Sequence, residues 1–206
     1  MTKLLRIDAS ARTVGSHSRR LADFVEASWR AQNPNGKVVY RDLVKTPIPH
    51  IQNETILGFY TPASDMTLPL KMATALSDEL IEELKSCDEI LISSPLYNLS
   101  IPSNLKAYID QVVRVGHTFQ VTEEGQYFGL LKGKKAYLAL VKGANYAGTP
   151  MEASDFQQPY LKAILSYLGI ELTEAFCLEG TSHPESLELN MPKILTQIKN
   201  RFEHAA

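Results

Sequence analysis

The sequence predicts a doubly wound α/β fold, in which a five-stranded parallel sheet is covered by helices on both faces. Short apolar runs alternate with longer segments of helical period along the 206 residues. The five runs are almost continuously apolar, which is typical of parallel strands that are buried on both faces. Because crossover connections between parallel strands are right-handed, the helices are expected on both sides of the sheet.

The chain opens with a strand–helix–strand unit. Residues 3–8 are predicted as the first strand, residues 17–31 as a helix and residues 37–41 as the second strand. The apolar side chains of this helix recur at three- and four-residue intervals, at Leu21, Phe24, Val25 and Trp29. The other face carries the charged residues Arg19, Arg20, Asp23, Glu26 and Arg30. The pattern predicts an amphipathic helix that packs on the sheet.

The same alternation continues to the end of the chain. A helix at residues 70–86 has an apolar stripe at Met72, Leu76, Leu80 and Leu84. The remaining elements are predicted as strand 89–94, helix 104–115, strand 135–141, helix 155–168 ended by Gly169, strand 173–178 and helix 184–202. Five such units favour the flavodoxin-like strand order 2-1-3-4-5 over a six-stranded dinucleotide domain or an eightfold barrel.

Two segments interrupt the alternation. Residues 42–69 are long for a connection and contain Pro47, Pro49, Pro62 and Pro69. We expect them to form a surface excursion. Residues 118–131 alternate apolar and polar side chains around a turn near residues 124–125, which predicts a β-hairpin. Such a hairpin could cover a site or a partner.

Composition and charge exclude several classes of protein. With 44% hydrophobic and 21% charged residues, the chain is expected to form one soluble globular domain over residues 1–206. A net charge of −2 without a basic stripe argues against a nucleic-acid partner. No apolar run is long enough for a membrane span or a secretion signal, so we expect a cytoplasmic protein. Cys87 and Cys177 form no CxxC or Cys/His cluster, which indicates buried structural thiols and no metal site.

A candidate anion site follows the first strand. In open parallel sheets, ligands bind beyond the carboxyl ends of the strands. The loop there contains Ser10, Arg12, Ser16, His17 and Ser18, and the next helix adds its free N–H groups, which together suit a phosphate. The loop lacks both GxGxxG and GxxxxGK[ST], so it is neither a Rossmann dinucleotide site nor a P-loop. The alternative, that a serine only caps the helix, remains equally open.

A second candidate segment follows the third strand. It reads Pro95, Leu96, Tyr97, Asn98 and Leu99, and a further proline follows at position 102. The prolines stiffen a loop that offers apolar, aromatic and amide groups, which suits the face or edge of a flat heterocycle. Taken alone, the loop is also compatible with a proline-rich turn into the next helix, with Ser103 or Asn104 as its cap.

These motifs together resemble the FMN-dependent NADH-azoreductases, also called FMN-dependent NADH:quinone oxidoreductases, of the flavodoxin superfamily. The resemblance covers nearly the whole chain. It is carried by residues 10, 16–18, 42–43, 47–49, 76–80, 95–98, 105–108, 116–119, 131–135, 159–161 and 169–170.

The resemblance implies three cofactor contacts. Ser10, Ser16, His17 and Ser18 are expected to bind the FMN phosphate, and Pro95, Leu96, Tyr97, Asn98 and Leu99 to lie against the isoalloxazine ring. The third contact follows strand 135–141, where the family usually reads Ser-Arg-Gly-Gly and this chain reads Val141, Lys142, Gly143 and Ala144. Lys142 and Gly143 are the expected contacts there. Gly143 still allows close backbone approach, whereas the family's serine hydroxyl and second glycine are missing.

The resemblance also implies a mechanism and an assembly. NADH would give hydride to bound FMN in a ping-pong cycle, and a quinone or an aromatic azo compound would then take its place and be reduced. We assign no catalytic side chain, because the cofactor carries the chemistry. Members of the family are homodimers with active sites at the interface, so the 118–131 hairpin is expected to lie over a flavin. Tyr127 and Tyr167 are candidates for stacking on substrate or for ordinary packing.

Two other functions stay open at this point. A non-catalytic flavodoxin-like FMN electron carrier would share the fold, but such carriers are markedly acidic and this chain is nearly neutral. A flavin-free interaction domain would also share it. The receiver type of such a domain needs paired acids after the first strand, whereas Asp8 is followed by alanine.

Overall fold

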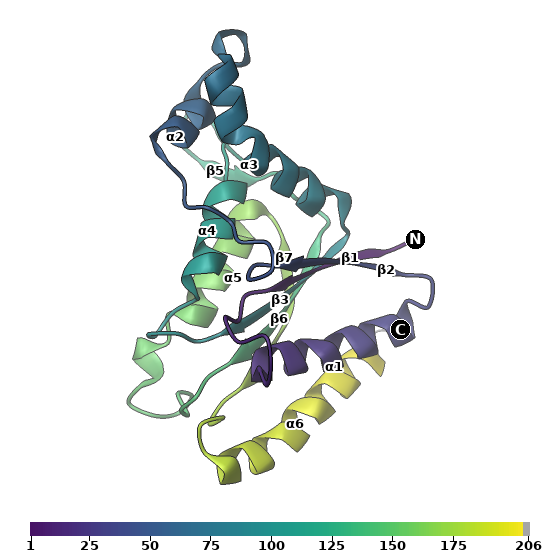
Figure 1. Cartoon of the computed structure of the whole chain (residues 1–206). Coiled ribbons are helices and arrows are strands. Elements are labelled where there is room, and N and C mark those ends of the chain that lie inside the picture. The colour runs from purple at the N-terminus through teal and green to yellow at the C-terminus, as the bar shows by residue number, and fades with distance from the viewer. Residues whose placement is uncertain (204–206) are drawn as a thin grey trace.

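The computed structural model describes residues 1–203 and contains a five-stranded parallel sheet between two layers of helices (Figure 1). The strands run in the order β2-β1-β3-β6-β7. They are β1 (Lys3–Asp8), β2 (Lys37–Asp42), β3 (Glu89–Pro95), β6 (Lys135–Val141) and β7 (Glu171–Leu178). Every neighbouring pair is parallel. Counted along the main sheet, this is the predicted order 2-1-3-4-5.

Helices cover both faces, as the sequence predicts. One layer consists of α1 (His17–Gln32) and α6 (Pro184–Glu203), and the other of α3 (Leu68–Ser86), α4 (Ser103–Val112) and α5 (Gln157–Leu168) (Figure 1). Successive side chains of a strand point to opposite faces. Leu4 therefore packs in the α1/α6 layer, while Leu5 and Ile7 pack in the other. The two hydrophobic cores lie on either side of the sheet.

The start of α1 and the end of α4 are set by side chains. The Ser16 hydroxyl accepts a hydrogen bond from the Arg19 backbone N–H at 3.4 Å and caps α1. The predicted helix 104–115 stops earlier, at Val112. The reason is Thr118, whose Oγ1 donates to the Val112 carbonyl at 2.6 Å and accepts from the Arg114 N–H at 3.0 Å.

The surface excursion predicted for residues 42–69 is more ordered than expected. It contains α2 (Asn53–Tyr60) and a short 3-10 turn (Ala63–Asp65), and it buries Leu43 and Ile48. A Cβ at Gly58 of α2 would lie 2.5 Å from Thr74 Cγ2 of α3, so the two helices pack closely. The pair forms an arm that projects beyond the sheet (Figure 1).

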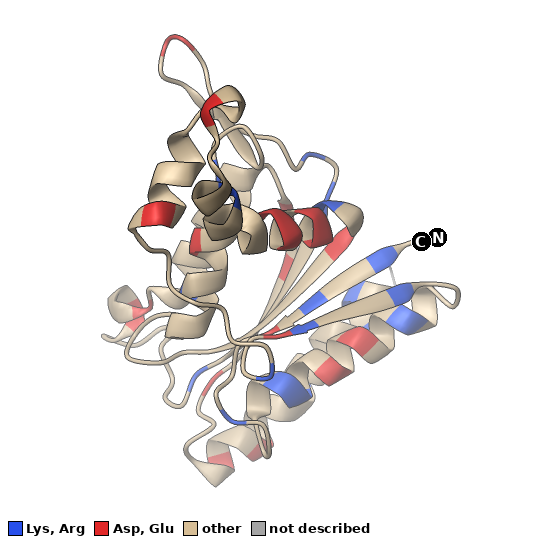
Figure 2. Ribbon diagram, turned by 45° about the horizontal axis from the view of Figure 1, so that its top comes forward, with Lys and Arg blue, Asp and Glu red and all other residues tan. Residues whose placement is uncertain are grey.

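Two predicted surface assignments were wrong. Met72, placed in the apolar stripe, is 72% exposed because its part of α3 lies in the projecting arm. Glu26, placed on the solvent face of α1, is buried and accepts a hydrogen bond from Arg6 at 2.9 Å. Figure 2 shows basic and acidic residues side by side along α1. The buried Arg6 on β1 therefore has Glu26 as a buried partner, although helical periodicity alone predicts an exposed Glu26.

The predicted hairpin is confirmed as β4 (Phe119–Val121) paired antiparallel with β5 (Tyr127–Gly129). Its base rests on the end of α5, where the Leu131 N–H donates to the Leu168 carbonyl at 3.0 Å. Cys87 is buried as expected, whereas Cys177 is only partly buried. Among residues 1–203, no helix is long and apolar enough to cross a membrane. The same residues contain no group of three or more His, Cys, Asp or Glu side chains that could hold a metal ion.

Candidate functional site

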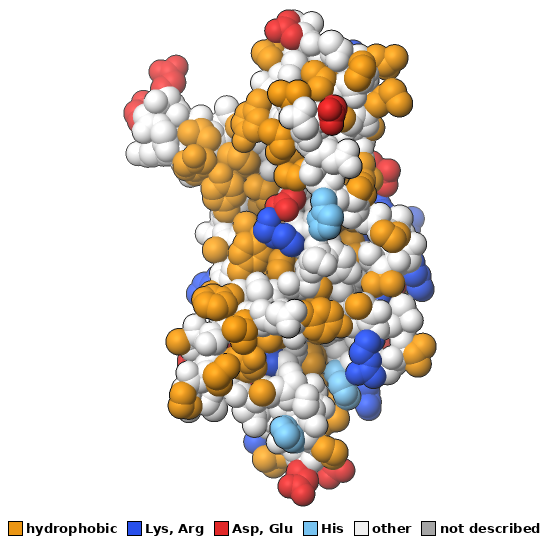
Figure 3. Space-filling view, turned by 60° about the vertical axis from the view of Figure 1, so that its left-hand side comes forward, with side chains coloured by type: hydrophobic (Ala, Val, Ile, Leu, Met, Phe, Trp, Pro, Cys, Tyr) orange, Lys and Arg blue, Asp and Glu red, His pale blue; other side chains and the backbone are white. Residues whose placement is uncertain are grey.

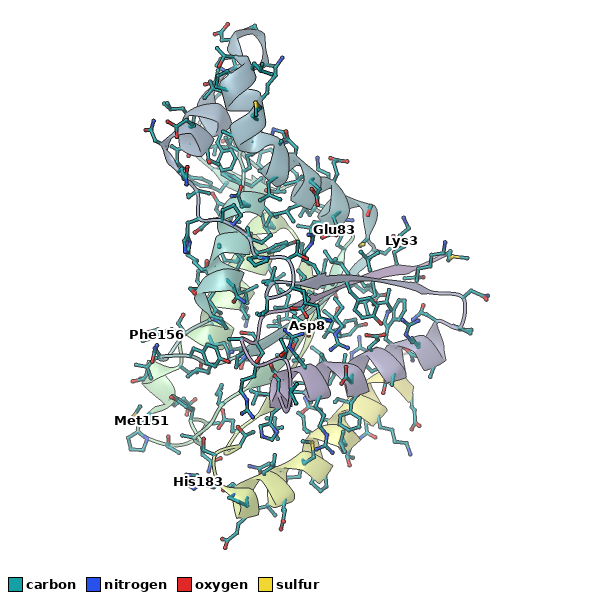
Figure 4. The ribbon with its side chains drawn as sticks, in the orientation of Figure 1. Lys3, Asp8, Glu83, Met151, Phe156 and His183 are labelled. Carbon is teal, nitrogen blue, oxygen red and sulfur yellow. The ribbon has the colours of Figure 1, made fainter. Side chains whose placement is uncertain are left out.

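The loops that follow β1, β3 and β6 meet at the carboxyl edge of the sheet. The Ala9 N–H donates to the Ser93 carbonyl at 2.9 Å, and the Leu96 N–H donates to the Val141 carbonyl at 2.7 Å. Asn104, in the first turn of α4, donates from Nδ2 to the Ala9 carbonyl at 3.1 Å. In Figure 4, Asp8 lies toward this edge and Lys3 at the opposite one. The fold thus joins the three segments that the sequence assigns to one ligand.

The loop after β1 gathers three buried hydroxyl groups around the start of α1. Ser10 is 2% exposed, Ser16 is 9% exposed and Ser18 is 1% exposed. The hydroxyls of Ser16 and Ser18 lie 3.2 Å apart, and Ser10 Oγ accepts from the Arg12 N–H at 3.2 Å. Gly15, at a φ of 67°, turns the chain into the helix. Because the first turn of a helix leaves its N–H groups without intrahelical partners, this loop can bind an anion.

Charges of both signs lie close to this loop. Asp8 at the end of β1 pairs with Arg6 at 3.1 Å, which also pairs with Asp23 and Glu26, and it faces Arg19 at 3.8 Å. Burial lowers the pKa of His17, and the nearby Arg12 and Arg20 lower it further. The imidazole is therefore neutral at pH 7 and can offer one N–H. The two arginines and the N-terminal end of the helix dipole supply positive potential there.

The loop after β3 is closed by an unusual turn. The N–H of Tyr97 donates to the Ser100 carbonyl at 2.9 Å, and the Ser100 N–H donates back to the Tyr97 carbonyl at 3.0 Å. Between them, Asn98 has a φ of 47° and Leu99 a φ of 71°. Asparagine tolerates this left-handed region, but a leucine there costs roughly 1–2 kcal/mol. The Phe156 N–H fixes the turn by donating to the Leu99 carbonyl at 3.0 Å.

Local strain of this kind is characteristic of functional sites. Sequence patterns did not reveal the turn, because turns with two left-handed residues are normally marked by glycine or by an Asn-Gly pair. Asn98 is the only such signal here, and leucine follows it. A cavity of about 490 Å³ opens beside the turn and is lined by Tyr97, Asn98, Ser100, Ile101, Pro102, Ser103, Lys106 and Tyr160.

The loop after β6 is hydrogen-bonded to the loop after β7, where the N–H groups of Thr181 and Ser182 donate to the Lys142 and Gly143 carbonyls at 3.2 and 3.0 Å. Lys142 is 3% exposed, and its Nζ lies 2.7 Å from Asp155 Oδ2 and 2.8 Å from Glu179 Oε1. Burial by itself would lower the pKa of Lys142, but the hydrogen bonds with the two carboxylates raise it overall. A Cβ at Gly143 would lie 2.6 Å from Ser182 Oγ, so a larger residue there would have to displace that hydroxyl.

Several polar groups near this edge were not singled out by sequence reasoning. Gln157, at the start of α5, is fully buried and donates from Nε2 to the Ser94 carbonyl at 3.1 Å. Within residues 1–203, Gln157 Oε1 and Ser93 Oγ are buried without a hydrogen-bond partner. The guanidinium of Arg19 lies behind the β1 loop and contacts two of its carbonyls. These residues lie within helices and strands, where a single polar side chain forms no recognisable sequence motif.

The two candidate tyrosines belong to one aromatic cluster. Phe119, Tyr127 and Tyr167 have ring centroids 4.8 to 6.1 Å apart. The cluster fixes the base of the hairpin against α5. Tyr127 is 62% exposed, so it has both a packing partner and a free face.

Comparisons with known proteins agree with this geometry. The family model for the flavodoxin-like fold matches residues 2–202. A protein from Xanthobacter autotrophicus is 49% identical over 172 residues, which cover 82% of each chain. One from Hydrogenovibrio crunogenus is 45% identical over 207 residues, which cover 99% of each. Both are named FMN-dependent NADH:quinone oxidoreductase. A solved azoreductase from Bacillus anthracis is 28% identical, with a TM-score of 0.90 over 98% of this chain and 99% of that one.

Proposed function

The chain belongs to the flavodoxin-like fold family and, within it, to the FMN-dependent NADH:quinone oxidoreductases, and on this premise we propose that it transfers hydride from NADH through bound FMN to quinones and aromatic azo compounds. One observation supports this function most directly. The loop of buried hydroxyls at the N-terminus of α1 follows β1, and the strained 97–100 turn follows β3, which pairs directly with β1. FMN pairs a phosphate with a flat heterocycle and therefore suits both.

The residues of the β1 loop fit the phosphate. Ser10, Ser16 and Ser18 supply hydroxyl donors, and the first turn of α1 supplies N–H donors in an almost solvent-free position. His17 adds an N–H from its neutral ring. Capping and binding are compatible, because Ser16 caps α1 through one lone pair and keeps its own O–H for a ligand.

The residues of the β3 loop fit the ring. Pro95, Leu96, Tyr97 and Leu99 offer apolar surface, and the Asn98 side chain offers a donor and an acceptor. The left-handed turn holds these groups in one conformation before any ligand arrives. Bound FMN supplies the reversible uptake of hydride. The chain's own residues hold the cofactor, orient it and shield it from water.

Gly143 is proposed to contact the cofactor through its backbone N–H, and Lys142 to hold the loop that presents it. The Lys142 ammonium is paired with Asp155 and Glu179, its N–H donates to the Leu178 carbonyl and its carbonyl accepts from the Thr181 N–H. The carbonyls of Gly143 and Ala144 accept from the N–H groups of Ser182 and Gly180, so the N–H groups of residues 143 and 144 are left for a ligand. The ion pairs join the β6 loop to the residues before α5 and after β7. This arrangement supports the loop without the serine and second glycine that the family usually has.

Steady-state kinetics test the activity. With FMN added, the protein should oxidise NADH only when benzoquinone or an azo dye is present as the acceptor. Varying both substrates should give parallel double-reciprocal lines, as expected when one pocket serves the donor and the acceptor in turn. Bound FMN without turnover would instead indicate the electron carrier. No FMN binding would indicate the flavin-free interaction domain, although nothing in the comparisons favours either alternative.

We propose further that the protein is a homodimer with its active sites at the interface. Large apolar side chains are exposed on the α2/α3 arm, on the hairpin and on the loops at the carboxyl edge of the sheet, where Met151 and Phe156 lie (Figures 3 and 4). They include Ile56, Leu57, Tyr60, Met72, Tyr127, Phe128, Leu130, Met151 and Phe156. A surface with this many exposed apolar groups is typical of an interaction site. Sedimentation velocity should give twice the chain mass of 23.0 kDa.

The organisation and location of the chain are also proposals. We infer that residues 1–206 fold as one FMN-binding domain, of which residues 204–206 lie outside the described part. A single cooperative thermal transition that shifts upward with FMN would support this. We place the protein in the cytoplasm, where NADH is available, without a nucleic-acid or membrane partner. When cells that express the protein are fractionated, it should be recovered in the cytoplasmic fraction and not with the membranes.

A further inference from the structure

We propose that Arg19 is a positioning residue that shapes the loop at residues 10–16 for a phosphate, and that it therefore sets the preference for FMN over the same flavin without phosphate. This inference rests on the proposed function, because it assumes that the loop binds the phosphate of FMN. Arg19 belongs to α1, but its side chain turns back behind the loop.

One guanidinium group holds two carbonyls of the loop. Arg19 Nε donates to the Arg12 carbonyl at 3.1 Å, and Nη2 donates to the Ser10 carbonyl at 3.0 Å. Arg19 thereby ties residues 10–12 to α1, the helix whose start carries the paired hydroxyls of Ser16 and Ser18. Because a carbonyl oxygen repels an anion, a phosphate loop needs its carbonyls turned outward and its N–H groups turned inward. The arginine occupies the outward side.

The other side of the guanidinium is fixed by β2. Nη1 and Nη2 donate to the two carboxylate oxygens of Asp42 at 2.6 and 2.9 Å, in a bidentate pair. Asp42 itself accepts the N–H of Val44 at 3.0 Å. The hydrogen bonds from Arg19 are the largest cause that lowers the pKa of Asp42 to about 2. The pair therefore stays ionised throughout the physiological pH range, and it ties the loop to the end of the adjacent strand.

The geometry distinguishes positioning from simple attraction by charge. The positive charge of Arg19 is offset by Asp42 at 2.6 Å and by Asp8 at 3.8 Å, so little of it remains to attract a phosphate. What arginine supplies is a planar set of donors that reaches two carbonyls and a carboxylate at once, which lysine cannot do. The Arg19 side chain is only 14% exposed, so it acts from within the protein and not from the surface.

Two matched variants test this role in the full-length chain without flavin. Arg19→Met removes the guanidinium, and Arg20→Met removes the same charge one residue later, from an exposed side chain whose guanidinium packs over Phe24. FMN and riboflavin are titrated against each variant and the wild type, and bound flavin is followed by its fluorescence. Thermal unfolding without flavin is measured in parallel.

We expect Arg19→Met to raise the Kd for FMN at least about tenfold, which is the loss of one charge-assisted hydrogen bond's free energy, while the Kd for riboflavin changes less than about twofold. Arg20→Met removes positive potential near the loop but no hydrogen bond to its carbonyls, so it should raise the Kd for FMN by no more than about threefold. Arg19→Lys should behave like Arg19→Met, since a point charge cannot hold both carbonyls.

Other outcomes overturn the proposal. Equal weakening of FMN and riboflavin would mean a general structural role, and equal effects of Arg19→Met and Arg20→Met would mean attraction by charge alone. If Arg19→Met does not fold, Asp42→Asn, which loosens the same pair, must show the loss of preference. Wild-type protein that binds no FMN would overturn the proposed function and this role together. Wild-type binding with an unchanged Arg19→Met would overturn the role alone.

Discussion

Ser16 caps α1, and we propose that it also binds the phosphate, two roles that the sequence could not separate. Its hydroxyl caps α1 by accepting the Arg19 N–H, and the same hydroxyl lies 3.2 Å from that of the buried Ser18. A serine that served only as a cap would not need a second, almost fully buried hydroxyl beside it. The pair therefore supports the proposed phosphate site.

Replacing both serines with alanine tests this interpretation. Ser16→Ala/Ser18→Ala should raise the Kd for FMN about a hundredfold, because two hydrogen bonds to a charged phosphate are lost. Loss of the cap should lower the free energy of unfolding without flavin by only about 1 kcal/mol. Equilibrium titration and denaturant unfolding measure the two effects. Ser64→Ala, in the exposed 3-10 turn, is the control. Unchanged FMN affinity in the double variant would mean that the phosphate binds elsewhere.

Asn98 offers a second test at the scale of a residue. Asn98→Ala should lower turnover by up to about tenfold with FMN still bound, because one hydrogen bond to the ring contributes about 0.5–1.5 kcal/mol. Asn98→Gly is the matched variant, since glycine adopts the observed φ of 47° without strain. If both variants are slow, the amide side chain matters. A slow alanine variant and a normal glycine variant would mean that only the backbone conformation matters.

Lys142 shows the limit of reading side chains from a motif. Its position after β6 was predicted from the resemblance, but its partners Asp155 and Glu179 lie 13 and 37 residues away and carry no pattern that links them to it. The pairing of Arg19 with Asp42 was overlooked for the same reason. Their pairing spans 23 residues and depends on how α1 lies against β2. Roles of this kind are set by tertiary contacts.

Removing the Lys142 ammonium should destabilise the fold in a pH-dependent way. Lys142→Met leaves two carboxylates largely buried without a counter-ion, which costs about 3–5 kcal/mol near neutral pH. Burial would raise the pKa of Glu179, but Lys142 holds it below its usual value. The stability that this pairing gives is therefore present above the ordinary pKa of a glutamate and is lost as the pH falls.

In the variant, by contrast, protonation of the unpaired carboxylates relieves their burial. The difference in unfolding free energy between wild type and Lys142→Met should therefore narrow as the pH falls below 5. Denaturant titrations at several pH values measure it. Lys162→Met, on the exposed face of α5, should show no such trend. A difference that stays constant with pH would contradict the assigned ion pairs.

At the scale of elements, strongly periodic segments were predicted well and irregular ones were not. All five sheet strands and the main helices follow from apolar runs and helical period, with ends shifted by up to three residues. The helix α2 within residues 42–69 was not predicted, because it has only eight residues and is surrounded by prolines. Its partner is α3, so a contact within the arm, rather than with the sheet, stabilises it.

The hairpin depends on one glycine. A Cβ at Gly129 would lie 2.0 Å from the backbone of Leu168 and Gly169, so β5 can rest on the end of α5 only without a side chain there. Gly129→Ala should displace the hairpin and destabilise the protein by roughly 1–3 kcal/mol. Tyr127 fluorescence and thermal unfolding report the change. Gly125→Asn at the open hairpin tip, where asparagine tolerates the φ of 79°, should be nearly neutral. A stable Gly129→Ala protein with an unmoved hairpin would contradict this packing.

At the scale of the whole molecule, the strand order was predictable because right-handed crossovers leave few ways to connect five parallel strands. The order in turn brings the β1, β3 and β6 loops to neighbouring positions. The location of the candidate site therefore follows from topology alone, without reference to side chains. The surface proposed for dimer assembly could not be predicted in this way. The exposed apolar side chains come from an arm, a hairpin and loops that only the fold brings to the surface together.

The most direct test of the central claim is a visible absorption spectrum of the purified protein with added FMN, recorded before and after anaerobic NADH and again after benzoquinone. The protein should hold FMN through gel filtration, the flavin bands should bleach with NADH, and they should recover with the quinone. Bands that remain unbleached, or FMN that separates from the protein, would contradict the assignment of this chain as an FMN-dependent NADH:quinone oxidoreductase.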